Sequence, residues 1–402
     1  MKVLQINAVY GVGSTGVIVR DIHELCLEHG IDAYVAYSTS NLDRKDIANS
    51  YKIGNTLDKK LHALLCRING KQAYFSRGAT RRLIKYIKEI GPDVVHLHNL
   101  HSNYVNLNML LDFLAESDIA TVITLHDCWF YTGGCFHYTD VGCDRWRKVC
   151  GSCPKKAKDT RAFFLDKSSR ILKDRKDKLC KIKNLTVVGV SEWITNEARS
   201  TFLGEKKCVT VHNGVDTGFY APTSSGIREE IGIKDKFVVL AIANKWRLPT
   251  NRETLRVVSE CLDENSVIVM IGCNDRDKKL MPEKVITLDY IRDKNRMREF
   301  YSMADVFANC TREESFSLVN IEAQACGTPT VTYKNTGAQE TVDPTLGLAV
   351  ETGDAQAFLE AINTVKKHGK GAYSQKCTEW AQTHFDKEEN YLKYIEIYKS
   401  LV

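Results

Sequence analysis

The sequence has no long apolar segment. No hydrophobic run approaches the roughly 18–20 residues that cross a bilayer. The apolar stretch near the start, KVLQINAVY, follows a single lysine and leads into a glycine turn. It lacks the basic start, the long apolar core and the small-residue cleavage site of a secretion signal. We therefore expect a cytoplasmic protein whose 14 cysteines are mostly reduced.

Internal repeats and low-complexity segments are also missing, so nothing favours a repeat array or a disordered tail. What is present is a chain of 402 residues, 43% hydrophobic and 26% charged. This is enough material for a large core and too much for one ordinary domain. The length predicts two domains of roughly 150–200 residues each.

Short β-branched runs alternate with amphipathic helical stretches along most of the chain. This alternation is typical of βαβ units and predicts two doubly wound parallel sheets. Residues 212–226, rich in Gly, Ser, Pro and Asn, read as the linker between them. The alternation fails from about residue 130 to 179, which indicates an insertion. The expected strands cover residues 2–9, 32–38, 92–98, 120–127, 184–191, 236–244, 265–272, 284–290, 304–310 and 328–334.

A glycine-rich turn, GVGSTG at residues 11–16, follows the first predicted strand and opens a helix. It matches the G-x-G-x-x-G pattern that brings backbone amides close to a phosphate. A dinucleotide site also needs a carboxylate at the end of the second strand, but that strand ends in Ser38, Thr39 and Ser40. The turn is therefore either a plain tight turn or a loop that contacts a substrate phosphate.

Two carboxylates, Glu314 and Glu322, stand eight positions apart in TREESFSLVNIEAQACGTP. On one helix they would lie about 12 Å apart along the axis. They can share a ligand only if Glu314 lies in the turn before the helix. Buried carboxylates accept hydrogen bonds from neighbouring sugar hydroxyls, whereas the alternative is a solvated helix start with acids favoured by the helix dipole.

Four cysteines, Cys135, Cys143, Cys150 and Cys153, follow the pattern C-x7-C-x6-C-x2-C within the insertion. The closing C-x2-C is common in tetrahedral zinc sites, and four thiolates would leave no open coordination position. We therefore expect a possible structural zinc site here, with buried reduced cysteines or disulfides as alternatives. Cys128 and His137 could substitute as ligands.

Positive charge is concentrated in the first half of the chain. Residues 59–88 hold nine Lys/Arg and no Asp/Glu, and residues 144–183 hold fifteen against five, although the whole chain carries only +6. Such stretches could face nucleic acid, an anionic membrane or a lipid diphosphate, or be solvated helix faces. Nucleic-acid recognition motifs are lacking, so we expect no nucleic-acid partner.

Together these motifs resemble the family 4 glycosyltransferases, which are retaining enzymes of the GT-B fold. ESFSLVNIEAQACGTP resembles their nucleotide-sugar motif, GVGSTG their N-terminal glycine loop, TLHD at 124–127 their active-site histidine strand, HNGVDTGFY at 212–220 their linker, and NTGAQE at 335–340 their late donor loop. The cysteine-rich stretch after His126 is similar to that of bacterial colanic acid and O-antigen transferases.

The resemblance implies an α/β protein of the GT-B fold, in which two Rossmann-like doubly wound parallel-sheet domains face a cleft. Residues 1–212 would bind the acceptor and carry the insertion at about 128–180, and residues 213–380 would bind the nucleotide sugar. Residues 381–402 would form a helix that crosses back to the first domain.

The resemblance also implies roles for individual residues. His126 would lie beside the transferred sugar, Glu314 would bind sugar hydroxyls, Lys245 would neutralise the leaving diphosphate, and Glu322 would hold the ribose. The donor would further contact residues of the glycine loop, the helix start and the late loop: Gly13, Ser14, Thr15, Gly16, Ser317, Leu318, Val319, Gly337 and Ala338.

The chain departs from the family pattern in the stretch LAIANKWRLPTNRETL. Lys245 stands where the family usually has Arg, and Thr250 and Asn251 stand where Lys-Gly is expected. Arg247 or Arg252 could supply the missing charge. Ser317 also replaces a frequent Gly. Loss of a clamp charge could remove several kcal/mol of leaving-group stabilisation.

The sequence therefore predicts a retaining, metal-independent glycosyltransferase. It would move a hexose or N-acetylhexosamine, most simply from a UDP-sugar, to a lipid-linked (polyprenyl-diphosphate) or free saccharide acceptor in surface polysaccharide synthesis. No catalytic cofactor is expected. The protein would be cytoplasmic with peripheral contact to the inner face of the membrane. The alternative is a weakly active or non-catalytic sugar-binding subunit of an assembly complex.

Overall fold

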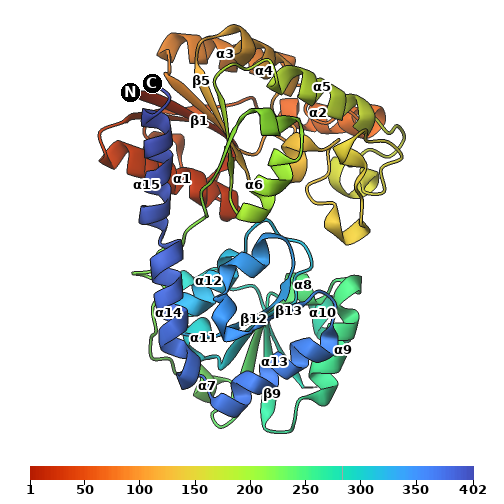
Figure 1. Ribbon diagram of the computed structural model, residues 1–402, viewed down its shortest axis with the longest axis vertical. Helices are drawn as coiled ribbons and strands as arrows, with labels where there is room; N and C mark the ends of the chain where they lie inside the picture. The colour runs from red at the N-terminus through yellow and green to blue at the C-terminus, as the bar shows by residue number, and fades with distance from the viewer. Residues whose placement is uncertain (283) are drawn as a thin grey trace. The chain divides into compact units, whose positions relative to one another are not determined.

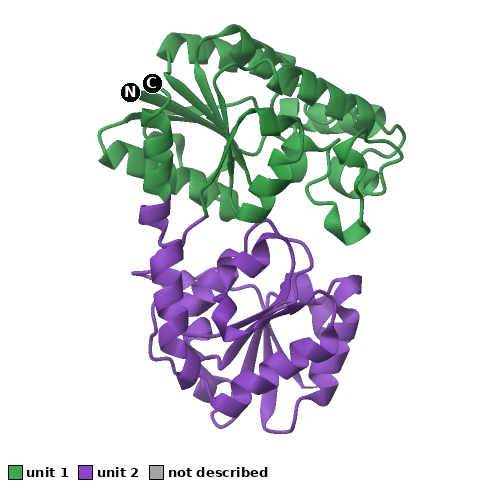
Figure 2. Ribbon diagram, viewed as in Figure 1, with its two compact units in different colours: residues 1–212, 391–402 green, residues 213–390 purple. Residues whose placement is uncertain are grey.

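The computed structural model describes residues 1–282 and 284–402. The described chain divides into two compact units (Figure 2). Unit 1 consists of Met1–His212 and Tyr391–Val402, and unit 2 consists of Asn213–Asn390. Each unit is a parallel β-sheet flanked by helices (Figure 1).

The sheet of unit 1 has seven strands in the order β3-β2-β1-β4-β5-β6-β7, and every neighbouring pair is parallel. The central strands are buried almost throughout, as expected for a parallel sheet with both faces covered. The strands are β1 (Lys2–Tyr10), β2 (Asp32–Ser40), β3 (Ser50–Lys52), β4 (Val94–Leu97), β5 (Ala120–Leu125), β6 (Leu185–Gly189) and β7 (Lys207–Thr210).

Asn55, Asn106 and Ser191 cap the starts of three helices of unit 1, and a glycine turn opens the first. Asn55 and Asp58, for example, form a reciprocal capping box at the start of the second helix, which satisfies two backbone donors at once. The helices are α1 (Gly13–Glu28), α2 (Thr56–Asn69), α3 (Arg77–Ile90), α4 (Leu107–Glu116), α5 (Ser168–Leu179) and α6 (Glu192–Arg199).

The sheet of unit 2 has six parallel strands in the order β10-β9-β8-β11-β12-β13. Its core is built from buried side chains of these strands and of α9 and α13, with Trp246 and Phe358 among the largest. The strands are β8 (Phe237–Ile242), β9 (Ser266–Ile271), β10 (Val285–Leu288), β11 (Val306–Asn309), β12 (Thr330–Lys334) and β13 (Ala349–Glu351). The helices are α7 (Ile227–Glu230), α8 (Ala243–Trp246), α9 (Arg252–Cys261), α10 (Asp275–Leu280), α11 (Lys294–Met303), α12 (Leu318–Ala325), α13 (Ala355–His368) and α14 (Gly371–Phe385), followed by α15 (Lys387–Lys399).

Both sheets reverse their strand order beside the first strand of the unit. In unit 1 this switch lies between β1 and β4, and in unit 2 between β8 and β11. Open α/β sheets bind ligands beyond the carboxyl ends of the strands at such a point. The segments that follow β1, β4, β8 and β11 are therefore the natural places to look for function.

The last residues of the chain complete the core of unit 1. The Tyr398 hydroxyl lies 2.6 Å from His96 Nδ1, and the Thr124 hydroxyl, 2.7 Å from His96 Nε2, donates to the Tyr394 hydroxyl at 3.1 Å. His96, Tyr394 and Tyr398 are fully buried. Residues nearly 300 positions apart thus share one polar cluster.

The cysteine-rich segment after β5 contains short helical turns and is anchored to α5 by Arg175. The Arg175 guanidinium is buried, lies 3.6 Å from the centre of the Trp129 ring, and donates to the carbonyl groups of Trp129 and Thr132. Such a stacked, multiply bonded arginine fixes the path of a loop.

The α/β prediction with two doubly wound parallel sheets is confirmed. Three-residue strands β3 and β13 were not predicted, because such short strands give weak periodic signals. Helix α2 was not predicted, because its stretch was interpreted only as positive charge. Within the described residues, no helix is both long and apolar enough to pass through a membrane.

Candidate functional site

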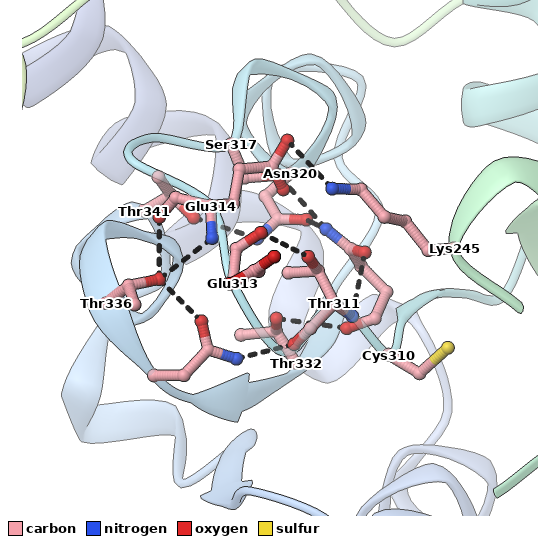
Figure 3. A network of polar contacts seen from close by, with 12 residues as sticks. Lys245, Cys310, Thr311, Glu313, Glu314, Ser317, Asn320, Thr332, Thr336 and Thr341 are labelled. Atoms are coloured by element: carbon pink, nitrogen blue, oxygen red, sulfur yellow. Dashed lines mark hydrogen bonds and ion pairs between the residues drawn. The ribbon is translucent and has the colours of Figure 1, made fainter. Parts of the chain in front are cut away.

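The acidic motif of unit 2 surrounds the start of α12 at the carboxyl end of β11 (Figure 3). Glu314 lies in the loop before the helix, and Glu322 lies within it. This is the arrangement that two carboxylates at this spacing need if they are to serve one ligand. The helix start also presents the amides of Leu318 and Val319, which lack acceptors within the helix because of their position in the first turn.

Lys245 and Glu314 form the charged centre of this region. Lys245 Nζ lies 3.7 Å from Glu314 Oε1, and each side chain is one quarter exposed. Among the residues the structure describes, the second oxygen, Glu314 Oε2, is buried without a hydrogen-bond partner. A buried carboxylate oxygen without a donor costs free energy, so this atom is suited to accept a hydrogen bond from a ligand.

A network of buried amides and hydroxyls holds the loop in place (Figure 3). Asn309 Nδ2 donates to Ser317 Oγ at 3.0 Å and to Asn320 Oδ1 at 2.8 Å. Asn320 in turn donates to Thr341 at 2.9 Å. The network therefore fixes Ser317, at the cap position of α12, relative to the end of β11 and to the late loop.

The late loop at 335–340 is joined by hydrogen bonds to the backbone of Glu314, in the loop before α12. Thr336 Oγ1 lies 3.0 Å from the Glu314 N–H and 2.6 Å from the Glu314 carbonyl, and the Gly337 N–H donates to the same carbonyl at 3.0 Å. The Ala338 carbonyl accepts from Thr341. The amide of Gly337, predicted to contact the donor, thus positions Glu314 in this structure.

Glu322 is held by two tyrosines. The Tyr301 hydroxyl donates to Glu322 Oε2 at 2.9 Å. Burial raises the pKa of the Glu322 carboxyl, although hydrogen bonds from Tyr301 and Tyr220 act to lower it. The side chain is therefore rigidly oriented within unit 2 before any ligand arrives.

The structure reveals a cation that sequence reasoning missed. Arg312 Nε donates to Asn251 Oδ1 at 2.9 Å. Asn251 is one of the two residues at the position of the expected Lys-Gly, so an arginine of the loop after β11 contacts this position. Burial raises the pKa of the Cys310 thiol, and Lys245 and Arg312 both act to lower it. Asn251 Nδ2 also donates to the carbonyl groups of Lys245 and Cys310, at 3.0 and 2.8 Å.

Arg247 and Arg252, the two arginines proposed from sequence to supply the missing charge, lie in different surroundings. Arg247 pairs with Asp277 at 3.0 Å, beside the start of α10. Arg252 is exposed at the start of α9. The ion pair of Arg247 does not include Lys245 or Glu314. Arg312, by contrast, belongs to the same loop as Glu314.

In unit 1 the glycine loop follows β1 and opens α1. Gly11 and Gly13 have φ of 68° and 65°, values that favour glycine. Gly13 and Ser14 are exposed, and Thr15 is half-buried. A Cβ at Gly16 would lie 3.0 Å from Val9 Cγ2, so this glycine permits close packing of helix and strand.

His126 ends a chain of buried histidines at the carboxyl ends of β4 and β5. His98 Nδ1 lies 3.0 Å from His126 Nε2, His98 Nε2 lies 3.1 Å from Gln5 Oε1, and the rings of His96 and His98 are 3.9 Å apart. Burial lowers the pKa of His126 to about 4. His126 is therefore neutral at pH 7 and can donate or accept one hydrogen bond without charging.

A polar pocket of about 280 Å³ lies in unit 1, near the row of histidines that ends at His126. Its wall includes His101, whose Nε2 lies 3.2 Å from Asp127 Oδ2. Burial acts to raise the pKa of Asp127, but hydrogen bonds from His101 and the Trp129 N–H bring that pKa below its usual value. The rest of the wall is largely basic and polar, with Arg67, Lys158 and Arg161.

The four cysteines predicted as zinc ligands do not form a metal centre in the structure. All four are free thiols, and they line one small cavity of about 20 Å³ together with Trp146. Burial raises the pKa of Cys135 to about 12 and that of Cys150 to about 11, so these thiols are protonated. In the part of the chain that the structure describes, no group of three or more His, Cys, Asp and Glu side chains is placed to hold an ion. The prediction of a structural zinc site is therefore not supported by the described residues.

Sequence signals for the missed residues differ in strength. The alternation H-L-H at 96–98, where a strand ends, could have indicated the histidine chain. Arg312 and Thr336 could not be found, since their roles depend on contacts with Asn251 and Glu314 across 61 and 22 positions.

Two doubly wound parallel sheets, each with polar side chains at the carboxyl edge of its switch point, are the architecture of the GT-B fold. Solved structures agree: sucrose-phosphate synthase from Thermosynechococcus elongatus has a TM-score of 0.71 at 16% identity, covering 100% of this chain and 98% of that one. Anabaena Alr3699/HepE in complex with UDP and glucose has a TM-score of 0.65 at 15% identity, covering both chains fully.

Family models identify the chain more narrowly. Residues 16–219 match the model "Glycosyltransferase Family 4", and residues 253–384 match "Glycosyl transferases group 1". The chain belongs to Glycosyltransferase Family 4, as its motifs predicted. It is 21% identical over 374 residues to the protein assigned as the colanic acid biosynthesis glycosyl transferase WcaC of Escherichia coli (strain K12), with 90% of each chain covered. It is also 28% identical over 184 residues to D-inositol 3-phosphate glycosyltransferase of Mycobacteroides abscessus, covering 42% of each.

Proposed function

We propose that this protein is a retaining glycosyltransferase that moves a hexose or N-acetylhexosamine from a UDP-sugar to a lipid-linked or free saccharide in surface polysaccharide synthesis. The observation that carries the proposal is Glu314 Oε2, which is buried and has no hydrogen-bond partner among the described residues, beside Lys245 at the carboxyl edge of the unit 2 sheet. The similarity to WcaC and the fold shared with the UDP-bound HepE support it.

In this proposal unit 2 holds the donor. Glu314 Oε2 accepts a hydroxyl of the sugar, Glu322 orients the ribose, and the start of α12, with Ser317, Leu318 and Val319, faces the nucleotide. Lys245 lies next to the departing diphosphate, where a fixed cation stabilises developing negative charge. The bond from the anomeric carbon to the diphosphate oxygen breaks, and the acceptor oxygen bonds to that carbon on the same face, which retains configuration. The departing diphosphate takes up the proton of the acceptor hydroxyl.

Arg312 supplies the charge that Thr250 and Asn251 do not. Its Nε is already fixed on Asn251 Oδ1 at 2.9 Å, so its remaining donors can turn to a diphosphate at little cost in side-chain entropy. Arg312→Gln should lower kcat for nucleotide release by roughly 10²-fold, the usual cost of one lost transition-state contact. The exposed Arg252→Gln is the matched control and should retain activity.

Unit 1 takes the acceptor in this scheme. Neutral His126 positions a hydroxyl near the transferred sugar, and the pocket around His101 and Asp127 receives more distant parts of the acceptor. The glycine loop at 13–16 supplies amides at the same edge of the sheet. The protein acts in the cytoplasm, with peripheral contact to the inner face of the membrane.

The alternative, a non-catalytic sugar-binding subunit, is favoured by one observation: Thr250 and Asn251 replace the family's Lys-Gly. A screen of UDP- and GDP-sugars for nucleotide release, with lipid-linked and free saccharide acceptors and mass spectrometry of the product, separates the two. Turnover that is lost in Glu322→Ala supports the transferase. Sugar binding without release from any donor supports the subunit.

A further inference from the structure

The outward face of α2 is apolar. Leu57, Leu61, Leu64 and Ile68 are all exposed, Leu57 by 74%. At roughly 100° per residue these four positions fall within about 60° of one another, so they form a single stripe along the helix.

The inward face of the same helix is polar. His62 and Cys66 are its buried residues; His62 Nδ1 lies 2.7 Å from Ser76 Oγ, and Cys66 Sγ donates to the Thr160 carbonyl. A surface helix of a globular protein normally buries its apolar stripe. In α2 the arrangement is reversed, so packing in the core of unit 1 does not account for the leucines on its outward face.

A second apolar segment adjoins the end of this helix. Phe163, Phe164 and Leu165 are exposed, Phe164 by 75%. The Phe163 N–H donates to the Arg67 carbonyl at 3.2 Å, and a Cβ on Gly70 would lie 2.1 Å from the Leu165 carbonyl oxygen, so the two segments are in close contact. The stripe and Phe163–Leu165 are hereafter the α2 face.

The surroundings of the α2 face are basic. Residues 56–71 and 156–167 contain eight Lys/Arg and three Asp/Glu, a net charge of +5. The three acids accept backbone hydrogen bonds: Asp58 caps α2, Asp159 accepts from Phe136, and Asp166 accepts from Cys153 and Ser168. Lys60 and Arg67 flank the stripe along one side of the helix.

We propose that the α2 face binds the surface of an anionic lipid bilayer, with the leucines and phenylalanines in the headgroup–acyl boundary and the lysines and arginines on the phosphates. Exposed apolar patches of this kind mark interaction sites. An apolar stripe bordered by basic residues is the pattern of helices that lie in a membrane interface. Excess positive charge complements the anionic cytoplasmic leaflet.

The pocket in unit 1 adjoins the same two segments that carry the α2 face. Ala63, Cys66 and Arg67 of α2, with Lys158 and Arg161, line the pocket. If the proposed function holds, a lipid-linked acceptor could keep its chain in the bilayer while its phosphates reach this pocket. The bilayer contact itself does not require the transfer reaction.

The test is co-sedimentation of the whole protein with vesicles of phosphatidylcholine alone and of phosphatidylcholine with phosphatidylglycerol. We expect binding to the anionic vesicles, weakened by salt, and roughly tenfold weaker partitioning for Leu61→Ser/Leu64→Ser and for Phe164→Ser. Tyr290→Ser, which removes a side chain that is 76% exposed in unit 2, is the matched control and should bind like the wild type.

Three results would overturn the proposal. They are no binding to anionic vesicles, equal binding by the variants and the wild type, and a solution dimer that Leu61→Ser/Leu64→Ser dissociates, which would assign the face to a second copy. A thermal shift with UDP, measured on the same variants, reports separately on unit 2. Vesicle binding and nucleotide binding can therefore fail independently.

Discussion

At the scale of single residues, the site in unit 2 is built around a carboxylate in an unfavourable environment. Glu314 Oε2 is buried, and the described residues offer it no hydrogen-bond donor. Its backbone, by contrast, is fastened at both N–H and carbonyl by the loop at Thr336 and Gly337. A position so firmly held and so poorly satisfied is suited to bind a ligand.

Glu314→Gln should therefore separate activity from stability. Loss of the anionic acceptor should lower kcat/KM for nucleotide release by roughly 10²–10³-fold. The midpoint of thermal unfolding should stay the same or rise, because an amide is cheaper to bury than a carboxylate without a donor. Steady-state kinetics and calorimetry measure the two effects.

The neighbouring Glu313→Gln is the control for this experiment and should change kcat/KM little. A Glu314→Gln protein with full activity would contradict the role assigned to this carboxylate, whatever its stability.

Sequence reasoning at this scale named Lys245, Glu314 and Ser317 as site residues, and their roles stay predictions. The structure places Lys245 next to Glu314 and holds Ser317 by a hydrogen bond from Asn309. Arg312 was missed because its importance depends on Asn251, which is distant in sequence. The zinc prediction is not supported, because the spacing of cysteines in a sequence does not report how their side chains are placed in space.

At the scale of elements, α12 is placed by a buried polar network as much as by apolar packing. Asn309 at the end of β11 is the central donor, and it serves both the cap residue Ser317 and Asn320 inside the helix. Fully satisfied networks of this kind specify one arrangement, and partly satisfied ones are costly.

Asn309→Ala should lower the free energy of unfolding. It leaves Ser317 Oγ and Asn320 Oδ1 without their donor, and each unsatisfied buried group costs about 1–3 kcal/mol. Urea unfolding should show a lower midpoint with a similar slope. Thr364→Ala on α13, whose exposed hydroxyl bonds only within its own helix, should stay within about 0.5 kcal/mol. An equally stable Asn309→Ala protein would show that the network does not hold the helix.

Elements were predictable from sequence in proportion to their length and burial. The strands β1, β5 and β9 gave near-continuous apolar runs and were predicted. The three-residue β3 and β13 are too short for a pattern. Helix α2 lies in a stretch interpreted only as positive charge, and its apolar stripe cannot be assigned to the outside without the structure.

At the scale of the whole molecule, buried neutral histidines make stability depend on pH. Burial lowers the pKa of His23 and of His62 to about 4. In the unfolded chain a histidine takes up its proton near pH 6.5. Between these values the unfolded state binds more protons, so stability is full above about pH 6.5 and falls as the pH drops towards 4.

Each of these histidines should account for about 3 kcal/mol of this loss at pH 4. In His62→Gln the free energy of unfolding should fall less steeply between pH 6.5 and 4, measured by denaturant titration at each pH. The exposed His384→Gln should keep the wild-type slope. A His62→Gln slope equal to that of the wild type would show that His62 is protonated in the native state.

The discontinuity of unit 1 has a consequence for how the protein is made. A ribosome synthesises residues 391–402 after the whole of unit 2, yet Tyr394 and Tyr398 belong to the polar cluster around His96 in the first unit. Until those last residues emerge, His96 Nδ1 lacks its partner, the Tyr398 hydroxyl. The first unit to be translated is therefore the last to be completed, and unit 2 has the opportunity to fold while its predecessor is still open.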